Sequence, residues 1–180
     1  GGIGVDLRWR WTLRLMCFAL VVVVGAGLYL GLVHSASLEK EYDGQVEPAA
    51  KAGAKAIDAR AFARLVKARE TDSADYQAIR SALERLIRTR DLIGLRILGQ
   101  GPEDQVLLVF ALGEGADPDL IWKEPAGWLS DGLKSALFGL PATDPFSMGS
   151  DGHLIKSGFA PIVLSGETIG AVACTMDARS

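Results

Sequence analysis

The side chains of this sequence that could do catalytic chemistry are few and lie mostly in its second half. Ser150, Asp151 and His153 offer a hydroxyl, a carboxylate and an imidazole, but a catalytic triad is defined by spatial roles rather than by proximity in sequence. The two cysteines and two histidines show no Cys-x-x-Cys or His-x-x-x-His spacing, which is the pattern of zinc sites. We therefore expect no enzyme activity, no metal ion and no cofactor.

A binding site for a small molecule is the stronger expectation. Arg96, His153 and Lys156 are candidate anchors for an anion, because a carboxylate ligand needs a charge-assisted partner. Asp177, at the end of a strand-like run, could bind a cationic ligand or cap the chain before a following helix. Four bulky residues could wall a pocket or pack as a lid over a sheet: Trp122, Trp128, Phe138 and Phe146.

One apolar stretch organises the rest of the chain. The range 15–33 holds 19 consecutive residues without a charge, and as a helix it would be roughly 28 Å long, close to the ~30 Å hydrocarbon core of a bilayer. A cleaved signal peptide has an apolar region of only about 7–15 residues, and a buried core helix would need other parts of the chain to cover it. We therefore predict a retained transmembrane helix in contact with membrane lipid.

The flanks of this stretch predict its orientation in the membrane. Arg8, Arg10 and Arg14 precede it, whereas Lys40 stands alone among the acidic residues that follow it. Cytoplasmic flanks carry the excess of Lys and Arg. The sequence thus predicts an inner-membrane protein. Its N-terminal segment, residues 1–14, would lie in the cytoplasm, and the part of the chain after the membrane span would be periplasmic or extracellular.

Two features of the first 56 residues could support a homodimer. Gly27 and Gly31 have a small-xxx-small spacing that lets two membrane helices approach closely, although glycine is common in membrane helices anyway. Residues 34–56 have apolar positions on a rough 3-to-4 spacing, which predicts a helical stalk, interrupted or bent near Gly44 and Pro48. This stalk could pack against a partner helix or be a solvated linker.

The remainder, 57–180, is predicted to begin with two helices. Asp58 stands at an N-cap position before a short helix. Asp72 or Ser73 caps a second helix, in which apolar residues recur with the helical period. The residues expected to face inward are Phe62, Leu65, Val66, Tyr76, Ile79, Leu83, Leu86 and Ile87.

After Asp91 the apolar pattern changes to that of strands. The predicted strands are two pairs, each joined by a turn: 92–98 with 106–112, and 154–164 with 168–176. The segment 113–145 between them is irregular, with at most a short helix around 132–138. Helices followed by strands predict an α+β domain with an antiparallel sheet of about five strands and helices on one face. A pocket would lie between this sheet and the irregular segment.

Three segments resemble the single Cache-type, PAS-like extracytoplasmic sensor domains of bacterial signalling proteins: IDARAFARLV at 57–66, DYQAIRSALERLIRTRDL at 75–92 and FAPIVLSGETIGAVACTMD at 159–177. The positions that carry the resemblance on the closing hairpin are Ala160, Pro161, Ile162, Gly166, Gly170 and Asp177. The resemblance implies a PAS/Cache-like sheet and a small-molecule ligand. It also implies a second membrane span that leads to a diguanylate cyclase, histidine kinase or chemotaxis module.

Two departures from the family pattern are consistent with a degenerate pocket, which therefore remains an alternative. Related sensors often have a Tyr-Thr pair on the first strand and an aspartate at the end of the second, where this chain has Leu95-Arg96-Ile97-Leu98 and Phe110-Ala111-Leu112-Gly113.

The chain also begins Gly1-Gly2 without Met and stops after a strand-like run. We therefore expect a fragment of a longer protein.

Two classes of function remain from the sequence. The first is a sensory input domain, in which a ligand shifts the stalk helices of a dimer and biases a cytoplasmic output. The second is a non-catalytic envelope scaffold domain with a degenerate pocket. A further apolar run after Ser180 in the native reading frame would favour the first. A net charge of −3, from 19 basic and 22 acidic residues, gives no basic surface for nucleic acid.

Overall fold

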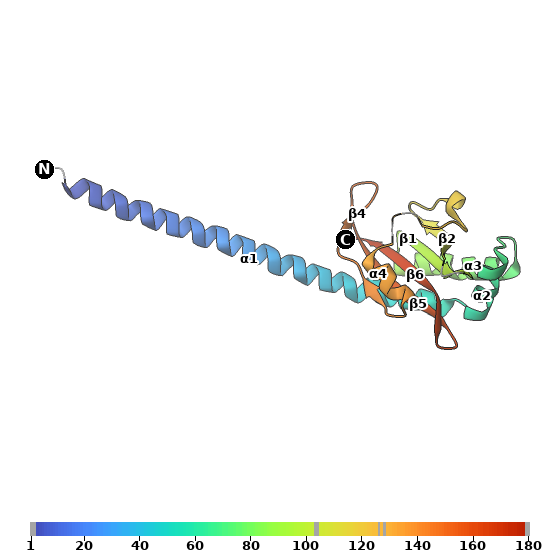
Figure 1. Cartoon of the computed structure of the whole chain (residues 1–180). Helices are drawn as coiled ribbons and strands as arrows, with labels where there is room; N and C mark the ends of the chain where they lie inside the picture. The colour runs from blue at the N-terminus through green and yellow to red at the C-terminus, as the bar shows by residue number, and fades with distance from the viewer. Residues whose placement is uncertain (1–2, 103–104, 126, 128, 179–180) are drawn as a thin grey trace. The chain divides into compact units, whose positions relative to one another are not determined.

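The computed structural model describes residues 3–102, 105–125, 127 and 129–178, and the side chains of residues 1–11 and 13 lie outside the description. The chain divides into two compact units, residues 1–40 and 41–180. The second unit holds the predicted globular range, 57–180, together with residues 41–56. The order of its elements can be followed in Figure 1.

A single helix, α1, runs without interruption over Ile3–Ala56. Of the predicted interruption or bend near Gly44 and Pro48, the interruption is wrong, because the helix is continuous there. Proline removes one helical hydrogen bond, and its ring crowds the carbonyl four residues earlier, which here is that of Gly44. Val46 and Ala50 are fully buried on either side of Pro48, so their packing outweighs the missing hydrogen bond.

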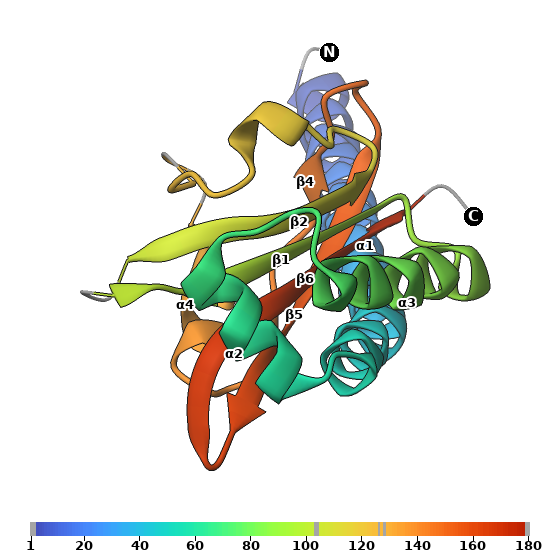
Figure 2. The same ribbon diagram turned by 90° about the vertical axis from the view of Figure 1, so that its right-hand side faces the viewer.

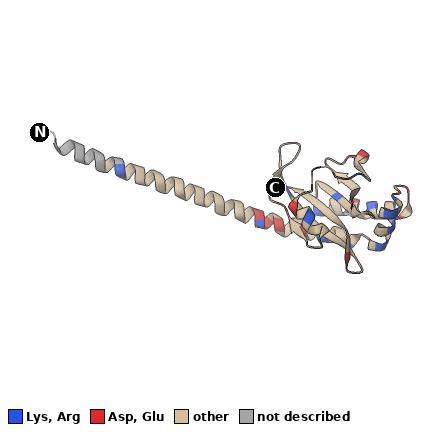
Figure 3. Cartoon of the chain, viewed as in Figure 1, with Lys and Arg blue, Asp and Glu red and all other residues tan. Residues whose placement is uncertain are grey.

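The unit of residues 1–40 contains the apolar stretch. Residues 15–33 are exposed to the surroundings of the protein and carry no Lys, Arg, Asp or Glu, as Figure 3 shows. Among the described residues, one helix is long and apolar enough to cross a membrane, with a mean hydropathy of 2.5 in its most apolar window and none of that window buried. Its length and composition fit the predicted span.

The unit of residues 41–180 is built on an antiparallel sheet with the strand order β2-β1-β6-β5-β3, and β4 pairs with β5. The four long strands agree with the prediction: β1 Gly94–Gln100, β2 Val106–Gly113, β5 Leu154–Leu164 and β6 Glu167–Asp177. At the tip of the β5–β6 hairpin, Ser165 and Gly166 have φ values of +53° and +87°, as a two-residue type I′ turn requires. The additional strands β3 (Ala142–Thr143) and β4 (Ser147–Met148) make the sheet six-stranded.

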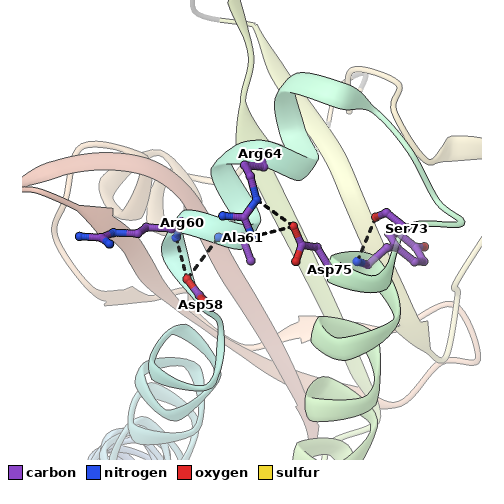
Figure 4. Close-up of polar contacts among 7 residues, drawn as sticks. Asp58, Arg60, Ala61, Arg64, Ser73 and Asp75 are labelled. Atoms are coloured by element: carbon purple, nitrogen blue, oxygen red, sulfur yellow. Dashed lines mark hydrogen bonds and ion pairs between the residues drawn. The ribbon is translucent and has the colours of Figure 1, made fainter.

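Helices α2 (Ala59–Ala68) and α3 (Ala74–Arg90) begin at side-chain caps, which Figure 4 shows. Asp58 Oδ1 accepts hydrogen bonds from the backbone N–H groups of Arg60 (2.9 Å) and Ala61 (3.2 Å). The bonds from Ala61 and then Arg60 hold the pKa of Asp58 below its ordinary value of 3.8, because they favour the ionised form. Ser73, rather than Asp72, caps α3 by accepting from Tyr76 N–H.

The end of α1, together with α2 and α3, covers one face of the sheet, as Figure 2 shows for α2 and α3. Phe62 of α2 and Leu83 of α3 are completely buried there, and each such side chain stabilises the fold by about 1.5–3 kcal/mol. The Tyr76 and Phe110 rings stack at 4.4 Å between centroids. Burial in this layer raises the pKa of the Cys174 thiol to about 12.

A short helix, α4 (Asp131–Leu137), packs on the opposite face of the sheet. Its Leu133 and Ala136 contact Phe159 of β5 and Ala173 of β6 within a second, smaller apolar cluster. The long helices thus lie on one face, as predicted, and α4 belongs to the irregular segment that crosses the other. A 3₁₀ turn, η2 (Pro118–Leu120), lies in the same segment.

Candidate functional site

A cavity of about 350 Å³ lies between the sheet and the irregular segment, where the sequence placed a pocket. Pockets for small ligands occupy about 300–1,000 Å³, so this volume suits a compound of few heavy atoms. Its floor comes from strand residues on the α4 face and its cover from the segment after β2. The lining consists of Arg96, Leu108, Ala111, Ser157, Phe159, Ala173 and Thr175 from strands, and Gly115, Asp117, Leu120, Ser130, Leu133 and Asp144 from the cover.

The cavity contains charges of both signs. Arg96 is half-buried on β1, with Nη2 3.5 Å from the carbonyl oxygen of Gly115. Asp144 is also half-buried, and its Oδ1 accepts a hydrogen bond of 3.0 Å from Gly132 N–H in the first turn of α4. Asp117 supplies a second carboxylate, more exposed than the first. A guanidinium and two carboxylates can bind a small molecule that carries an anionic and a cationic or hydroxyl group.

Hydroxyl groups complete the polar lining. Ser157 on β5 and Thr175 on β6 are cross-strand neighbours, and their oxygens lie 3.2 Å apart. A second hollow of about 260 Å³ continues towards β4 and shares Arg96, Gly115, Ser157 and Thr175 with the first. Arg96 therefore lines both spaces.

Of the six residues that the sequence proposed for ligand binding, Arg96 lies in the cavity. Lys156 is buried on the other face of the sheet, with Nζ 3.0 Å from Asp43 Oδ1 of α1. His153 lies in the turn between β4 and β5, with Nε2 3.0 Å from Asp151 Oδ2.

The remaining candidates also lie elsewhere. Asp177 lines an open cleft of about 850 Å³ between α1, the end of α3 and the end of β6. Trp122 packs against the apolar layer under α2 and α3, and its backbone N–H donates to Leu108 O at 2.7 Å. Trp128 falls outside the described residues.

Neither Phe138 nor Phe146 is among the residues that line the described cavity. Phe138 is 87% exposed, and Phe146 packs edge-to-face on Tyr42 of α1, with 5.6 Å between ring centroids. Phe159, three leucines and two alanines supply the apolar lining. Sequence reasoning passed over Asp117, Ser130, Asp144, Ser157 and Thr175. The signal for the last two was available, because alternate residues of a strand share one face.

The Asp151 and His153 side chains contact each other in the turn between β4 and β5, 3.0 Å apart. The described residues hold no group of three or more His, Cys, Asp or Glu side chains that could bind a metal ion.

Comparison with known proteins shows a likeness of fold. No protein-family model and no curated protein matches the sequence. The extracellular domain of a protein described as the histidine kinase vpHK1S-Z8 matches 81% of this chain with a TM-score of 0.51 and 14% identity. The sensor domain of the Vibrio cholerae histidine kinase DctB matches 81% with a TM-score of 0.50 and 13% identity.

A third solved structure, the ligand-binding domain of the Pseudomonas aeruginosa amino acid chemoreceptor PctC in complex with GABA, has a TM-score of 0.47, 18% identity and coverage of 84% of this chain. The chain spans 54%, 58% and 61% of the lengths of these three structures. These solved structures are Cache/PAS-like sensor domains, and this chain shares their fold.

Proposed function

We propose that this chain is a membrane-anchored sensory input domain that binds a small polar ligand in the cavity over β1, β5 and β6. The observation that carries the proposal is the position of Arg96, a half-buried guanidinium inside a cavity of about 350 Å³ that also holds Asp144. A charge-assisted bond to a ligand carboxylate would supply both affinity and orientation. Asp144 and Asp117 then favour a ligand that also carries an amine.

The membrane part of the proposal depends on residues 1–40. The uncharged stretch 15–33 would cross the inner membrane, with the arginine-rich end in the cytoplasm and residues 41–180 in the periplasm or outside the cell. The second unit includes the end of α1. A change in the packing of that end would be the signal passed to a cytoplasmic output module. Two chains would pair through their α1 helices at Gly27 and Gly31.

Thermal melting of the full chain in detergent micelles tests the binding proposal. The probes are a panel of small carboxylates, amines and amino acids, including acetate, succinate, ethylamine, glycine and GABA. A ligand at 100 times its Kd stabilises the folded state by about 2.7 kcal/mol, which for a domain of this size raises the midpoint by about 10 °C.

Arg96→Met should abolish the shift that an active compound produces. Arg80→Met is the matched control, because Arg80 is an exposed arginine on α3 that pairs with Glu84 at 3.0 Å. Absence of any shift across the panel, or an equal loss of response in both variants, would contradict binding at Arg96.

A further inference from the structure

Lys156 is a buried cation that the proposed ligand site does not use. Its side chain is 1% exposed, and it is the one buried charged side chain recorded among the described residues. An ammonium group taken out of water is costly unless it is paired. Its Nζ lies 3.0 Å from Asp43 Oδ1 and 5.0 Å from the centroid of the Phe146 ring, so an ion pair and a cation–π contact both hold it.

These contacts join three elements, and we call Asp43, Phe146 and Lys156 the clasp. Asp43 belongs to α1, Lys156 to β5, and Phe146 to the connection between β3 and β4. The Phe146 ring also contacts Tyr42, the residue before Asp43 on α1. The clasp therefore fixes this turn of α1 to the sheet and to the 142–148 segment together.

The same two segments also contribute to the cavity. Ser157 follows Lys156 on β5, and because successive side chains point to opposite faces, Ser157 lines the cavity while Lys156 faces α1. Asp144 lies two residues before Phe146 and lines the cavity as well. Its backbone N–H donates to Ser157 O at 3.0 Å, and its carboxylate accepts from Gly132 of α4. A displacement of Asp144 can therefore be transmitted to Phe146 along a short stretch of backbone.

Stability alone gives no reason for an ion pair at this place. Lys156 is buried and the Asp43 side chain is 37% exposed, and replacing an ion pair that is taken out of water with apolar residues of similar volume is often neutral or stabilising. An ion pair differs from apolar packing in that it attaches α1 at one point and with one geometry. The attachment of α1 to the sheet can therefore be strengthened or weakened by a change in this one ion pair.

We propose that the clasp couples the cavity to α1: displacement of Asp144 shifts Phe146 and changes how firmly residues 42–50 of α1 are held to β5. The inference rests on the proposed function for the event that displaces Asp144, namely ligand binding. The coupling itself requires no ligand and is testable without one.

The first measurement is amide hydrogen exchange of residues 42–50 in the full chain in detergent micelles. Lys156→Met leaves Asp43 without its cation, and exchange in this range should accelerate on the order of tenfold. Lys51→Met is the matched control, since it removes the exposed Lys51–Glu47 pair of the same helix and should change exchange by less than about twofold. Equal effects of the two substitutions would overturn the clasp.

The second measurement tests coupling to the cavity. Asp144→Ala removes the bond to Gly132 and should accelerate exchange of residues 42–50 several-fold in the native background. The Asp43→Leu/Lys156→Met background lacks both charges of the clasp and serves even where Lys156→Met alone fails to fold. In this background Asp144→Ala should have no such effect. The same acceleration in both backgrounds, or none in either, would overturn the coupling. A ligand found with the panel of small compounds would leave the binding proposal standing in either case.

Discussion

The close approach of β5 to α1 makes Gly158→Ala a sharp test of the packing on the helix side of the sheet. A Cβ added at Gly158 would lie 2.8 Å from the carbonyl oxygen of Val46 and 2.9 Å from its carbonyl carbon. Both are backbone atoms of a helix, so no side-chain rotation relieves the contact and α1 itself must move. Overpacking of a core costs about 1–3 kcal/mol, and we expect the upper end of that range here.

Gly44→Ala is the matched control on α1. Nothing lies within 4 Å of a Cβ at Gly44, and alanine in a helix interior is more stable than glycine by about 1 kcal/mol. The same chemical change should therefore shift stability in opposite directions at the two positions. For a domain of this size the midpoint should fall by about 12 °C for Gly158→Ala and rise by about 4 °C for Gly44→Ala.

Thermal and urea denaturation of the full chain in detergent micelles, followed by circular dichroism, measures both shifts. An unchanged urea m-value would show that the free energy of unfolding, and not the extent of unfolding, has changed. The packing described here would be refuted by a Gly158→Ala variant as stable as the native chain. It would equally be refuted by a Gly44→Ala variant that loses as much stability as Gly158→Ala.

Three further predictions follow from individual residues. Asp58→Ala should lower the melting midpoint at neutral pH. The folded-state pKa of Asp58 is depressed below 3.8. The contribution of its carboxylate to stability is therefore present above pH 3.8 and is lost as the pH falls through the folded-state pKa. In Asp58→Asn the melting midpoint should consequently fall less steeply with decreasing pH than in the native chain. With the pKa of Cys174 at about 12, maleimide should modify this thiol in a Cys17→Ser chain only in denaturant, and rapid modification of the folded chain would contradict its burial. Gly27→Leu and Gly31→Leu should weaken self-association measured by energy transfer in lipid vesicles, and unchanged association would exclude the glycine seam.

The elements that could be predicted from sequence are those whose local pattern agrees with their packing. The apolar stripe of α3 and the cap at Asp58 are local signals, and the structure contains both. Strands β3 and β4 could not be predicted because each has two residues, too few to show a period. The continuity of α1 through Pro48 could not be predicted either, because it depends on the burial of Val46 and Ala50 against a sheet far along the chain.

The site was harder to predict because residue type does not reveal which face of a strand a side chain occupies. Arg96 and Lys156 are both basic residues on strands, yet one lines the cavity and the other pairs with α1. Strand register decides between them. Trp122 has a positive φ of 65°, a conformation that a tryptophan rarely adopts and that sequence reasoning had no ground to expect.

The two glycines that carried the family resemblance are each required by the structure, for different reasons. Gly166 has a φ of +87° in the hairpin turn, where a Cβ would be strained. A Cβ at Gly170 would lie 2.2 Å from Leu98 O, so β6 can pass β1 at this point only without a side chain. These positions specify the fold of the sheet, and the choice of ligand depends on other residues.

The β5–β6 hairpin restricts where residues can be added to or removed from this domain. Its two-residue tip and the irregularity between Ile162 and Val163 fix which residues of β5 and β6 stand opposite each other. A shift of one residue turns every side chain of a strand to the other face, which for β5 would place Lys156 in the cavity and Ser157 against α1. Exposed loop tips usually accept insertions. Here the tip at Ser165 and Gly166 can accept substitutions that keep the turn, whereas an added or deleted residue would exchange the two faces of the strand.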